Sequence, residues 1–521
     1  LGDGIFDFCG LAVVIMGLTA ALTVNAKLIT FINNEPGKLV YVINNKAKGT
    51  STLHVTNMKI IGKINSEDLS LIHTMCTEWV LDTLDLSEVR IVGSEQQRSG
   101  SGVMRSKKVK SDEIDNSMFS QTHLKWISLP ATTKRIGEEA FEFCEELRTV
   151  VIPNSVKEIG NHAFAYCKKL TDITLPRDLT AIPDALFYDC ESLPKLTIPQ
   201  NVETIGNNAF AVCKAIPSVV IPDRVKTIGY SAFSAMQSVK SIVIGKGVEY
   251  IDTYAFFDNP HLEKLVMSPS IKTMKNGVFS TCPSLKEIDF CAQLDSLPAY
   301  TFYKNTSLQK VILPPTIKVI DDNAFRDCTA LKGIYIQSLD QWLKMKFVND
   351  RIWNVTSNPL QYAHNLYVNN KLVTDFVFPE GTTAVPDALL FGSSVKSITL
   401  PQTLKYIGLL AFYGCRNLKS IYYYGTKPAA CADGNVFKQI PQSNCTVYLL
   451  PGVDKSSFLL NFNWSNFQYD YMKVTAVDKV QADDGVSKFP IYDIDGRYRG
   501  DDATKLHKGL YISNGKKFLK R

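Results

Sequence analysis

The 521-residue chain has little excess charge, few histidines and no long apolar segment beyond its N-terminus. Its 57 basic and 51 acidic residues leave a net charge of +6, which by itself does not indicate a nucleic-acid partner. After the first 26 residues, no stretch is long and apolar enough to cross a bilayer. Hydrophobic content of 45% and charged content of 21% are typical of a folded chain, so wholesale disorder is excluded.

Signatures of catalysis and of metal binding are also missing. The sequence contains no H-E-x-x-H, no G-x-S-x-G and no glycine-rich phosphate loop. The seven histidines lie at unrelated positions: His54, His73, His123, His162, His261, His364 and His507. A Cys–His nucleophile stays open in principle, because such pairs form only in three dimensions. We therefore predict no enzyme, no metal and no cofactor.

The first 26 residues are typical of a secretory signal peptide. No charged residue occurs from Phe8 to Ala26, and Leu11 to Ala21 is a compact apolar stretch. Val24-Asn25-Ala26 supplies small residues at the spacing that signal peptidase reads, so we expect cleavage after Ala26. The alternative is a short membrane anchor, but the segment is shorter and less hydrophobic than the ~20 apolar residues of a membrane span.

A repeat of period 23 dominates the rest of the sequence. Nine segments begin 23 residues apart, at 136, 159, 182, 205, 228, 251, 274, 297 and 320. After an interruption the pattern returns from Val385 and from Ile407. The shared template is I-G-x-x-A-F-x-x-C-x-x-L-x-x-I-x-I/L-P, as in IGNHAFAYCKKLTDITLP from Ile159. A constant spacing over nine units predicts a solenoid of stacked, equivalent turns.

Each part of the template has a physical interpretation. The alternation in L-x-x-I-x-I/L predicts a short strand with inward Ile and Leu, and the following Pro ends that strand. The I-G-x-x-A-F segment has apolar residues about a helical turn apart, which predicts a turn of helix on the opposite side. Glycines there are expected to relax the backbone where the chain changes direction: Gly137, Gly160, Gly206, Gly229 and Gly408.

One phenylalanine recurs at the same template position in each unit. These residues are Phe141, Phe164, Phe210, Phe233, Phe256, Phe279, Phe302, Phe325 and Phe412. We expect them to stack as a continuous aromatic spine. A single unit cannot bury its own apolar face, but stacked units can, with strands about 4.8 Å apart in a parallel sheet.

The template resembles the units of the BspA-like leucine-rich-repeat family of bacterial surface proteins. Residues 338–342 and 357–367 look like that family's mid-array insertion, and residues 446–467, with VYLLPGVDKSSF and NWSNF, look like its terminal unit. The resemblance covers most of the chain from about residue 50 to 470. It implies an α/β repeat solenoid that is right-handed and curved, with short parallel strands on one face and short helical turns on the other.

We expect five consecutive parts. They are the signal peptide (1–26), an N-terminal cap with an irregular repeat (27–120), the repeat array (121–425, with the insertion at 338–380), a capping unit (426–472) and a small β tail (473–521). Through Y-D-x-x-G-R and G-x-Y-I-x-N-G-K, the tail resembles the C-terminal sorting modules of secreted Bacteroidota proteins. It is then an export or anchoring signal, or alternatively a small β appendage packed on the array.

Twelve cysteines in an exported chain raise the question of disulfides. Seven share one template position: Cys144, Cys167, Cys190, Cys213, Cys282, Cys328 and Cys415. Because Met236, Asn259 and Asn305 replace them elsewhere, we predict a column of small buried side chains with free thiols. A ladder of single cysteines is also a poor match to a metal site. Cys431 and Cys445 are the best candidates for a bridge, and their pairing stays open.

The outward positions of the strands are where we expect a partner to bind. Basic residues gather there in the second half of the array, and two tyrosines lie near the insertion. The candidate face consists of Lys240, Lys264, Lys286, Lys310, Lys332, Tyr335, Lys396, Lys419 and Tyr422. The alternative is that the lysines only keep an exposed sheet soluble and discourage sheet-on-sheet association.

With the family resemblance, this pattern implies a secreted or cell-surface, outer-membrane-associated binding scaffold. Its function would be adhesion or another interaction with a protein of a host cell or matrix. The alternative is a glycan-binding component of a surface nutrient-acquisition system. In that case Trp342, Trp353 and Tyr362 could stack on sugars, unless they pack the insertion against the array.

Overall fold

The computed structural model describes five long stretches and several short ones. The long stretches are residues 28–46, 55–93, 109–290, 293–348 and 357–472. The short ones are residues 491–493, 498–500, 505–506, 509–513 and 516–520. The expected signal peptide and Trp353 lie outside the described residues.

The chain begins with alternating strands and helices: β1 (Ile29–Asn33), α1 (Leu39–Lys46), β2 (Asn57–Ile64), α2 (Ser66–Thr77) and β3 (Thr83–Ile91). The three strands are parallel, and β3 pairs with β5 of the array, so one six-stranded sheet runs from β1 into the repeats. A capping box starts α2, because Asn65 accepts from the N–H of Asp68 while the Asp68 carboxylate accepts from the N–H of Asn65.

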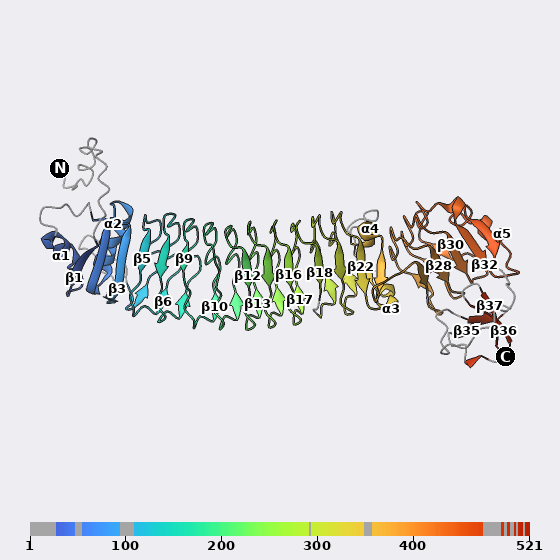
Figure 1. The fold of residues 1–521 in the computed structure, drawn as a ribbon, viewed down its shortest axis with the longest axis horizontal. Helices are drawn as coiled ribbons and strands as arrows, with labels where there is room; N and C mark the ends of the chain where they lie inside the picture. Colours follow the sequence, from blue (N-terminus) through green and yellow to red (C-terminus); the bar gives the residue numbers. More distant parts are fainter. Residues whose placement is uncertain are drawn as a thin grey trace, which may run out of the picture.

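The repeats form two rows of short parallel strands along a long, narrow molecule (Figure 1). The first row contains β5 (Trp126–Ser128), β7 (Thr149–Val151), β9 (Asp172–Ile173), β12 (Ser218–Val220), β14 (Ser241–Val243), β16 (Lys264–Val266), β18 (Glu287–Asp289), β20 (Lys310–Ile312) and β22 (Gly333–Ile336). The second row contains β4 (Glu113–Ile114), β6 (Arg135–Ile136), β8 (Glu158–Ile159), β10 (Ala181–Ile182), β11 (Thr204–Ile205), β13 (Thr227–Ile228), β15 (Tyr250–Ile251), β17 (Thr273–Met274), β19 (Ser296–Leu297) and β21 (Val319–Ile320). Paired residues such as Ile228 and Ile251 are 23 apart, which confirms the repeat and the parallel-strand solenoid.

The insertion continues both rows and then interrupts them. It contains α3 (Leu339–Leu343), β23 (Lys346–Phe347), α4 (Leu360–Ala363), β24 (Leu366–Val368) and β25 (Lys371–Leu372). β23 pairs with β21 and β24 with β22, both in parallel, whereas β25 folds back antiparallel on β24. The strand order of this sheet therefore ends at β25.

A second run of turns follows the insertion, at the C-terminal end of the molecule in Figure 1. Its strands are β26 (Asp375–Val377), β27 (Ala384–Val385), β28 (Ser397–Leu400), β29 (Tyr406–Ile407), β30 (Ser420–Tyr423), β31 (Ala430–Cys431), β32 (Thr446–Leu449) and β33 (Gln468–Tyr471), with a 3₁₀ turn at Gln442–Asn444 and α5 at Ser456–Leu459. In this run the sheet β26–β28–β30–β32–β33 takes the place of the first row, and the sheet β27–β29–β31 takes that of the second. The tail forms a separate antiparallel sheet of β34 (Ile491–Asp493), β35 (Tyr498–Gly500), β36 (Gly509–Ser513) and β37 (Lys516–Lys520).

The expected helical turn in each repeat is not confirmed. The I-G-x-x-A-F segment begins in a second-row strand and continues as turns in which some non-glycine residues have positive φ, such as His162 at 57° and Tyr166 at 60°. A helix would need each N–H to bond the carbonyl four residues back. Here the N–H of His162 instead donates to the carbonyl of Asp184 in the following turn, at 2.9 Å. The right-handed sense of the solenoid stays a prediction.

The template glycines have a different role from the expected one. None of the five has a positive φ. A Cβ at Gly160 would lie 2.5 Å from the backbone nitrogen of Glu138, and one at Gly229 would lie 2.7 Å from the carbonyl carbon of Gly206. These glycines therefore allow successive turns to approach closely, and other residues of the turn adopt the left-handed backbone.

The aromatic spine is confirmed and is longer than the sequence indicated. It starts at Phe119, includes Phe187 and continues to Phe325, with ring centroids of neighbouring turns 5.2 to 6.1 Å apart. It resumes where Phe412 stacks on Phe437 at 5.7 Å. Such pairs contribute roughly 0.5–1.5 kcal/mol each beyond their burial.

The cysteine column consists of free, buried thiols, as predicted. Six of the seven thiols donate to the carbonyl of the spine phenylalanine in the preceding turn, for example Cys190 Sγ to Phe164 O at 3.1 Å, and Cys415 donates to Leu390 O. Asn259 replaces a thiol because its Nδ2 makes the same bond, to Phe233 O at 3.0 Å. Cys431 and Cys445 are also free thiols in this structure, so no disulfide closes the terminal unit.

The close approach of the turns predicts a strong cost for a methyl group at a template glycine. Gly229→Ala places a Cβ against the backbone of Gly206, so we expect a loss of roughly 1–3 kcal/mol in the free energy of unfolding. Lys275 occupies the same template position in another turn and is exposed, so Lys275→Ala is the control. Urea unfolding followed by circular dichroism measures both, and equal midpoints would refute this role of glycine.

Burial also predicts the reactivity of the thiols. It raises the pKa of Cys213 and of Cys415 to about 12, so at pH 8 the reactive thiolate is far scarcer than in the unfolded chain, where a thiol has a pKa of about 8.5. We expect iodoacetamide to leave the cysteine column unmodified in the folded protein and to modify it fully in guanidinium chloride. Peptide mass spectrometry reads each site, and native labelling of the column would contradict its burial.

Candidate binding face

The structure places the candidate lysines and tyrosines in first-row strands or directly before them. Lys264 and Lys310 begin β16 and β20, and Tyr335 and Tyr422 are the third residues of β22 and β30. The other lysines immediately precede a strand: Lys240, Lys286, Lys332, Lys396 and Lys419. These positions belong to three sheets: β14 and β16 lie in one, β18, β20 and β22 in a second, and β28 and β30 in a third.

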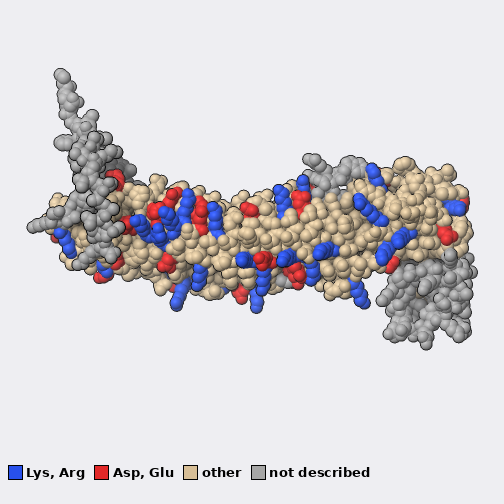
Figure 2. All heavy atoms as spheres, turned by 45° about the horizontal axis from the view of Figure 1, so that its top comes forward, with Lys and Arg blue, Asp and Glu red and all other residues tan. Residues whose placement is uncertain are grey.

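Acidic side chains are interspersed among the candidate lysines. Figure 2 shows basic and acidic residues alternating along the array rather than a uniformly basic stripe. Lys310 Nζ lies 2.6 Å from Glu287 Oε1, and this hydrogen bond raises the pKa of Lys310. Glu263 and Asp289 are also exposed at outward positions. Exposed pairs of this kind contribute little to stability, so their main effect is on the charge pattern that a partner meets.

Two pairs of stacked tyrosines are the most distinctive feature of the face. The rings of Tyr335 and Tyr367 are 4.4 Å apart and inclined by 5°, and Lys310 Nζ lies 5.2 Å from the centroid of Tyr335. The rings of Tyr422 and Tyr448 are 5.1 Å apart. All four side chains are half-buried, so each pair presents an aromatic surface that is only partly covered.

The partners Tyr367 and Tyr448 were missed by sequence reasoning. They lie in the insertion and in the terminal unit, outside the 23-residue template. Strand register brings them into place, because β24 aligns Tyr367 with Tyr335 and β32 aligns Tyr448 with Tyr422. The alternation in Leu-Tyr-Val (366–368) and Val-Tyr-Leu (447–449) could have revealed them, since the tyrosine lies between two apolar residues as Tyr335 and Tyr422 do.

Gly333 makes the first tyrosine pair possible. A Cβ at this position would lie 2.6 Å from the ring of Tyr367 and 3.1 Å from that of Tyr335. The equivalent position is a lysine in both β16 and β20. Because Gly333 has no side chain at the start of β22, the ring of Tyr367 can stack on the ring of Tyr335.

Two aromatic residues of the insertion, Trp342 and Tyr362, pack inward. Trp342 is fully buried, and its Nε1 donates to Leu389 O at 2.9 Å. Tyr362 is half-buried, and its hydroxyl accepts a hydrogen bond from the N–H of Asp327. Trp342 therefore fixes the insertion to the second run of turns and is not available to stack on a ligand.

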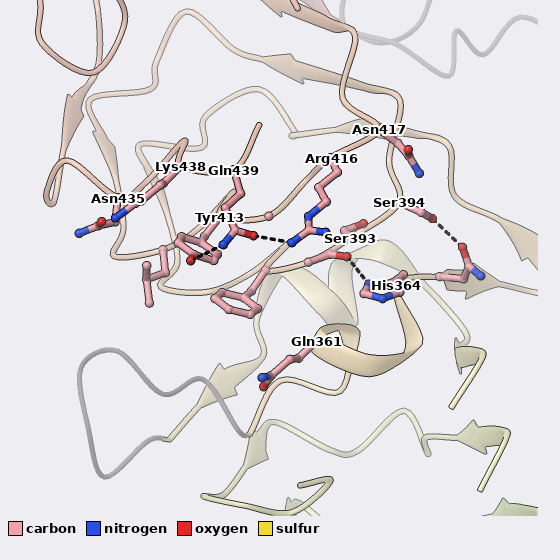
Figure 3. A pocket seen from close by; sticks show the side chains of 15 residues that line it. Gln361, His364, Ser393, Ser394, Tyr413, Arg416, Asn417, Asn435, Lys438 and Gln439 are labelled. Carbon is pink, nitrogen blue, oxygen red and sulfur yellow. Dashed lines mark hydrogen bonds between the residues drawn. The ribbon is translucent and has the colours of Figure 1, made fainter. Parts of the chain in front are cut away.

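A cleft of about 810 Å³ lies beside α4 and was not expected from the sequence. Figure 3 shows side chains from α4 and from three following turns around it. Gln439 connects two side chains of the preceding turn, since its Nε2 donates to Tyr413 Oη at 2.7 Å and its Oε1 accepts from Arg416 at 2.9 Å. On the opposite wall, His364 Nδ1 lies 2.7 Å from Gly392 O.

The described part of the chain contains neither a cluster of metal ligands nor a membrane-spanning helix. No group of three or more His, Cys, Asp or Glu side chains is arranged to hold a metal ion there. Within the same residues, no helix has the length and apolar character needed to cross a membrane.

Parallel strands, a buried ladder of Leu and Ile and a constant 23-residue turn define a leucine-rich-repeat scaffold. The chain belongs to the family described as BspA type leucine rich repeat region, which matches residues 112–238, 203–332 and 362–442 in six copies. This family match indicates a repeat scaffold and no catalytic family. A search of curated proteins found no match.

Several solved structures resemble the chain. A leucine-rich repeat protein from Bacteroides ovatus is 26% identical over 61% of this chain and 84% of its own, with a TM-score of 0.44. A leucine rich cell surface protein from Faecalibacterium prausnitzii is 24% identical over 51% of this chain and 92% of its own, with a TM-score of 0.27. The pneumococcal vaccine antigen PcpA is 17% identical over 80% of both chains, with a TM-score of 0.28.

Proposed function

We propose that this protein is a secreted or cell-surface scaffold, associated with the outer membrane, that binds a protein of a host cell or matrix. The binding surface is the outward side of the first-row strands from β14 to β30. The observation that carries the proposal is the pair of stacked tyrosines on β22 and β24, with Lys310 beside them. The family and the apolar N-terminal segment support the location outside the cell.

Stacked tyrosines suit protein recognition because they are rigid before a partner arrives. A tyrosine has few rotatable bonds, and packing against Tyr367 already restricts the ring of Tyr335, so little conformational entropy is lost on binding. The exposed lysines around the pair add a positive potential that speeds the approach of an acidic surface. The partner is therefore expected to be a protein with an acidic patch around an aromatic or apolar anchor.

The parts of the chain serve this surface in different ways. Residues 27–120 cover the first turn of the array, and residues 426–472 close its other end, because each exposed turn would otherwise leave its apolar core open. The tail from 473 to 521 serves as a sorting or anchoring module. The array between the caps, 121–425, holds the binding face.

The proposal predicts that the tyrosine stack contributes directly to affinity. Gly333→Ala inserts a Cβ where the Tyr367 ring lies and displaces the stack, and Tyr335→Ala removes it. We expect either change to weaken binding to a matrix protein by about tenfold or more, because aromatic anchors dominate such interfaces. Surface plasmon resonance with the full chain and a panel of purified extracellular matrix proteins measures this effect.

The matched control is Tyr406, a tyrosine on β29 in the second row that is 44% exposed. Tyr406→Ala should leave binding unchanged. If all three variants bind equally well, or if no matrix protein binds the unaltered chain, the proposed face is wrong. If binding weakens as the salt concentration rises but the tyrosine variants bind as tightly as the unaltered chain, the lysines are the recognition surface.

A further inference from the structure

The cleft beside α4 arises where the insertion interrupts the stacking of equivalent loops. In the regular array, the loop that follows each spine residue packs on the same loop of the turn before it. At Phe391 the preceding element is α4 instead, and His364 at its end reaches Gly392. The hydroxyl of Ser394 also donates to Asn365 Oδ1 at 2.6 Å. These contacts fix the two walls and leave the space between them open (Figure 3).

The lining of the cleft is polar and lacks carboxylates. It includes two exposed cations, Arg416 and Lys438, and no Asp or Glu. Among the described residues, neither cation forms an ion pair. This differs from the array, where lysines commonly pair with a glutamate 23 residues away, as Lys310 does with Glu287. The lining therefore carries positive charge and no carboxylate, and the adjacent Asp433 accepts hydrogen bonds from the N–H and the Nδ2 of Asn435.

The polar groups are held in place before any ligand binds. Gln439 connects Tyr413 to Arg416, so the hydroxyl and the guanidinium have fixed positions on one wall. Gln439 has a φ of 63°, in the left-handed region, whereas the equivalent residues of the two preceding turns are glycines, Gly392 and Gly414. The network thus depends on a side chain at a backbone position that favours glycine.

Aromatic rings complete the cleft. Phe391 and Tyr413 are stacked at 5.0 Å with an angle of 6°, and both are half-buried. Leu410 is the only aliphatic side chain in the lining, so the cleft has no pocket suited to apolar side chains. Amides contribute most of the remaining polar lining: Gln361, Asn365, Asn417, Asn435 and Gln439.

We propose that this cleft binds an oligosaccharide that carries an anionic group, a carboxylate or a sulfate. Amide and hydroxyl side chains both donate and accept hydrogen bonds, which matches the many hydroxyls of a sugar. The aromatic pair provides a flat surface for a sugar ring, and Arg416 forms charge-assisted hydrogen bonds with the anion. The volume is within the range of roughly 300–1,000 Å³ that is usual for ligand sites. The site shares no residue with the proposed protein-binding face.

Matched ligands test the charge and the class of the ligand. The full chain is titrated by isothermal calorimetry with hexagalacturonic acid, with its fully methyl-esterified form and with a chondroitin sulfate hexasaccharide. We expect at least one of the two anionic hexasaccharides to bind with 1:1 stoichiometry. For hexagalacturonic acid, esterification should raise Kd by about tenfold or more, because it removes the charge that Arg416 recognises. Comparison of the two acids distinguishes carboxylate from sulfate.

Variants test the assigned residues. Arg416→Gln should raise Kd for the bound acid by about tenfold or more. Gln439→Gly reproduces the residue of the two preceding turns and should weaken binding without lowering the midpoint of urea unfolding. Because Gln439 only positions Arg416 and Tyr413, Gln439→Gly should lower the affinity for the saccharide less than Arg416→Gln does. Lys405→Gln is the control, since it removes an exposed charge that belongs neither to the lining of the cleft nor to the candidate binding face, and it should leave saccharide binding unchanged.

Three outcomes would overturn the proposal. The first is an absence of binding by both acidic hexasaccharides at millimolar concentration. The second is that the esterified hexasaccharide binds as tightly as the acid, or that Arg416→Gln binds the acid as tightly as the unaltered chain. The third is equal or tighter binding of hexaglutamate with the same dependence on Arg416, which would make the cleft a peptide site. Because the tyrosine variants of the sheet face are not used, failure here leaves the proposed protein-binding function intact.

Discussion

Hydrogen bonding between successive turns is the interaction on which the rest of this structure depends. The two strand rows pair in register with the next turn, and the loops do the same, as when Phe164 N donates to Leu186 O at 3.1 Å. A single turn leaves these backbone groups unpaired, so it is stable only between two neighbours. A constant turn length follows, because a shift of one residue would move every inward side chain to the wrong face.

The side-chain columns are consequences of that register. Residues 23 apart lie beside one another, so phenylalanines stack, thiols reach the carbonyl of the turn before, and charges pair across turns. Lys214 with Glu191 at 2.9 Å and Lys272 with Glu249 at 2.8 Å are examples of such charge pairs. Asn259 fits the thiol column for the same reason, because its Nδ2 donates to Phe233 O as a thiol would.

Features that depend only on the repeat could be predicted from the sequence, and features that depend on neighbouring turns or on irregular segments could not. The strands, the aromatic spine and the free thiols follow from one unit repeated many times. The helical turn was not confirmed, because spacing in one unit cannot show that the N–H of His162 bonds the next turn. The role of Gly160 was misjudged for the same reason, since its constraint comes from Glu138. Tyr367 and the cleft lie where the template stops.

The interruption of the repeat is where a specific surface can form. A regular array presents nearly the same loop and strand surface in every turn, so it offers many similar sites and little to distinguish one ligand from another. At the insertion, β24 brings Tyr367 beside Tyr335, and α4 takes the place of a regular loop opposite Phe391. Both features arise at 338–380 because the turns on either side of this segment are not equivalent. The array therefore supplies the rigid support, and the irregular segment supplies the distinct chemistry.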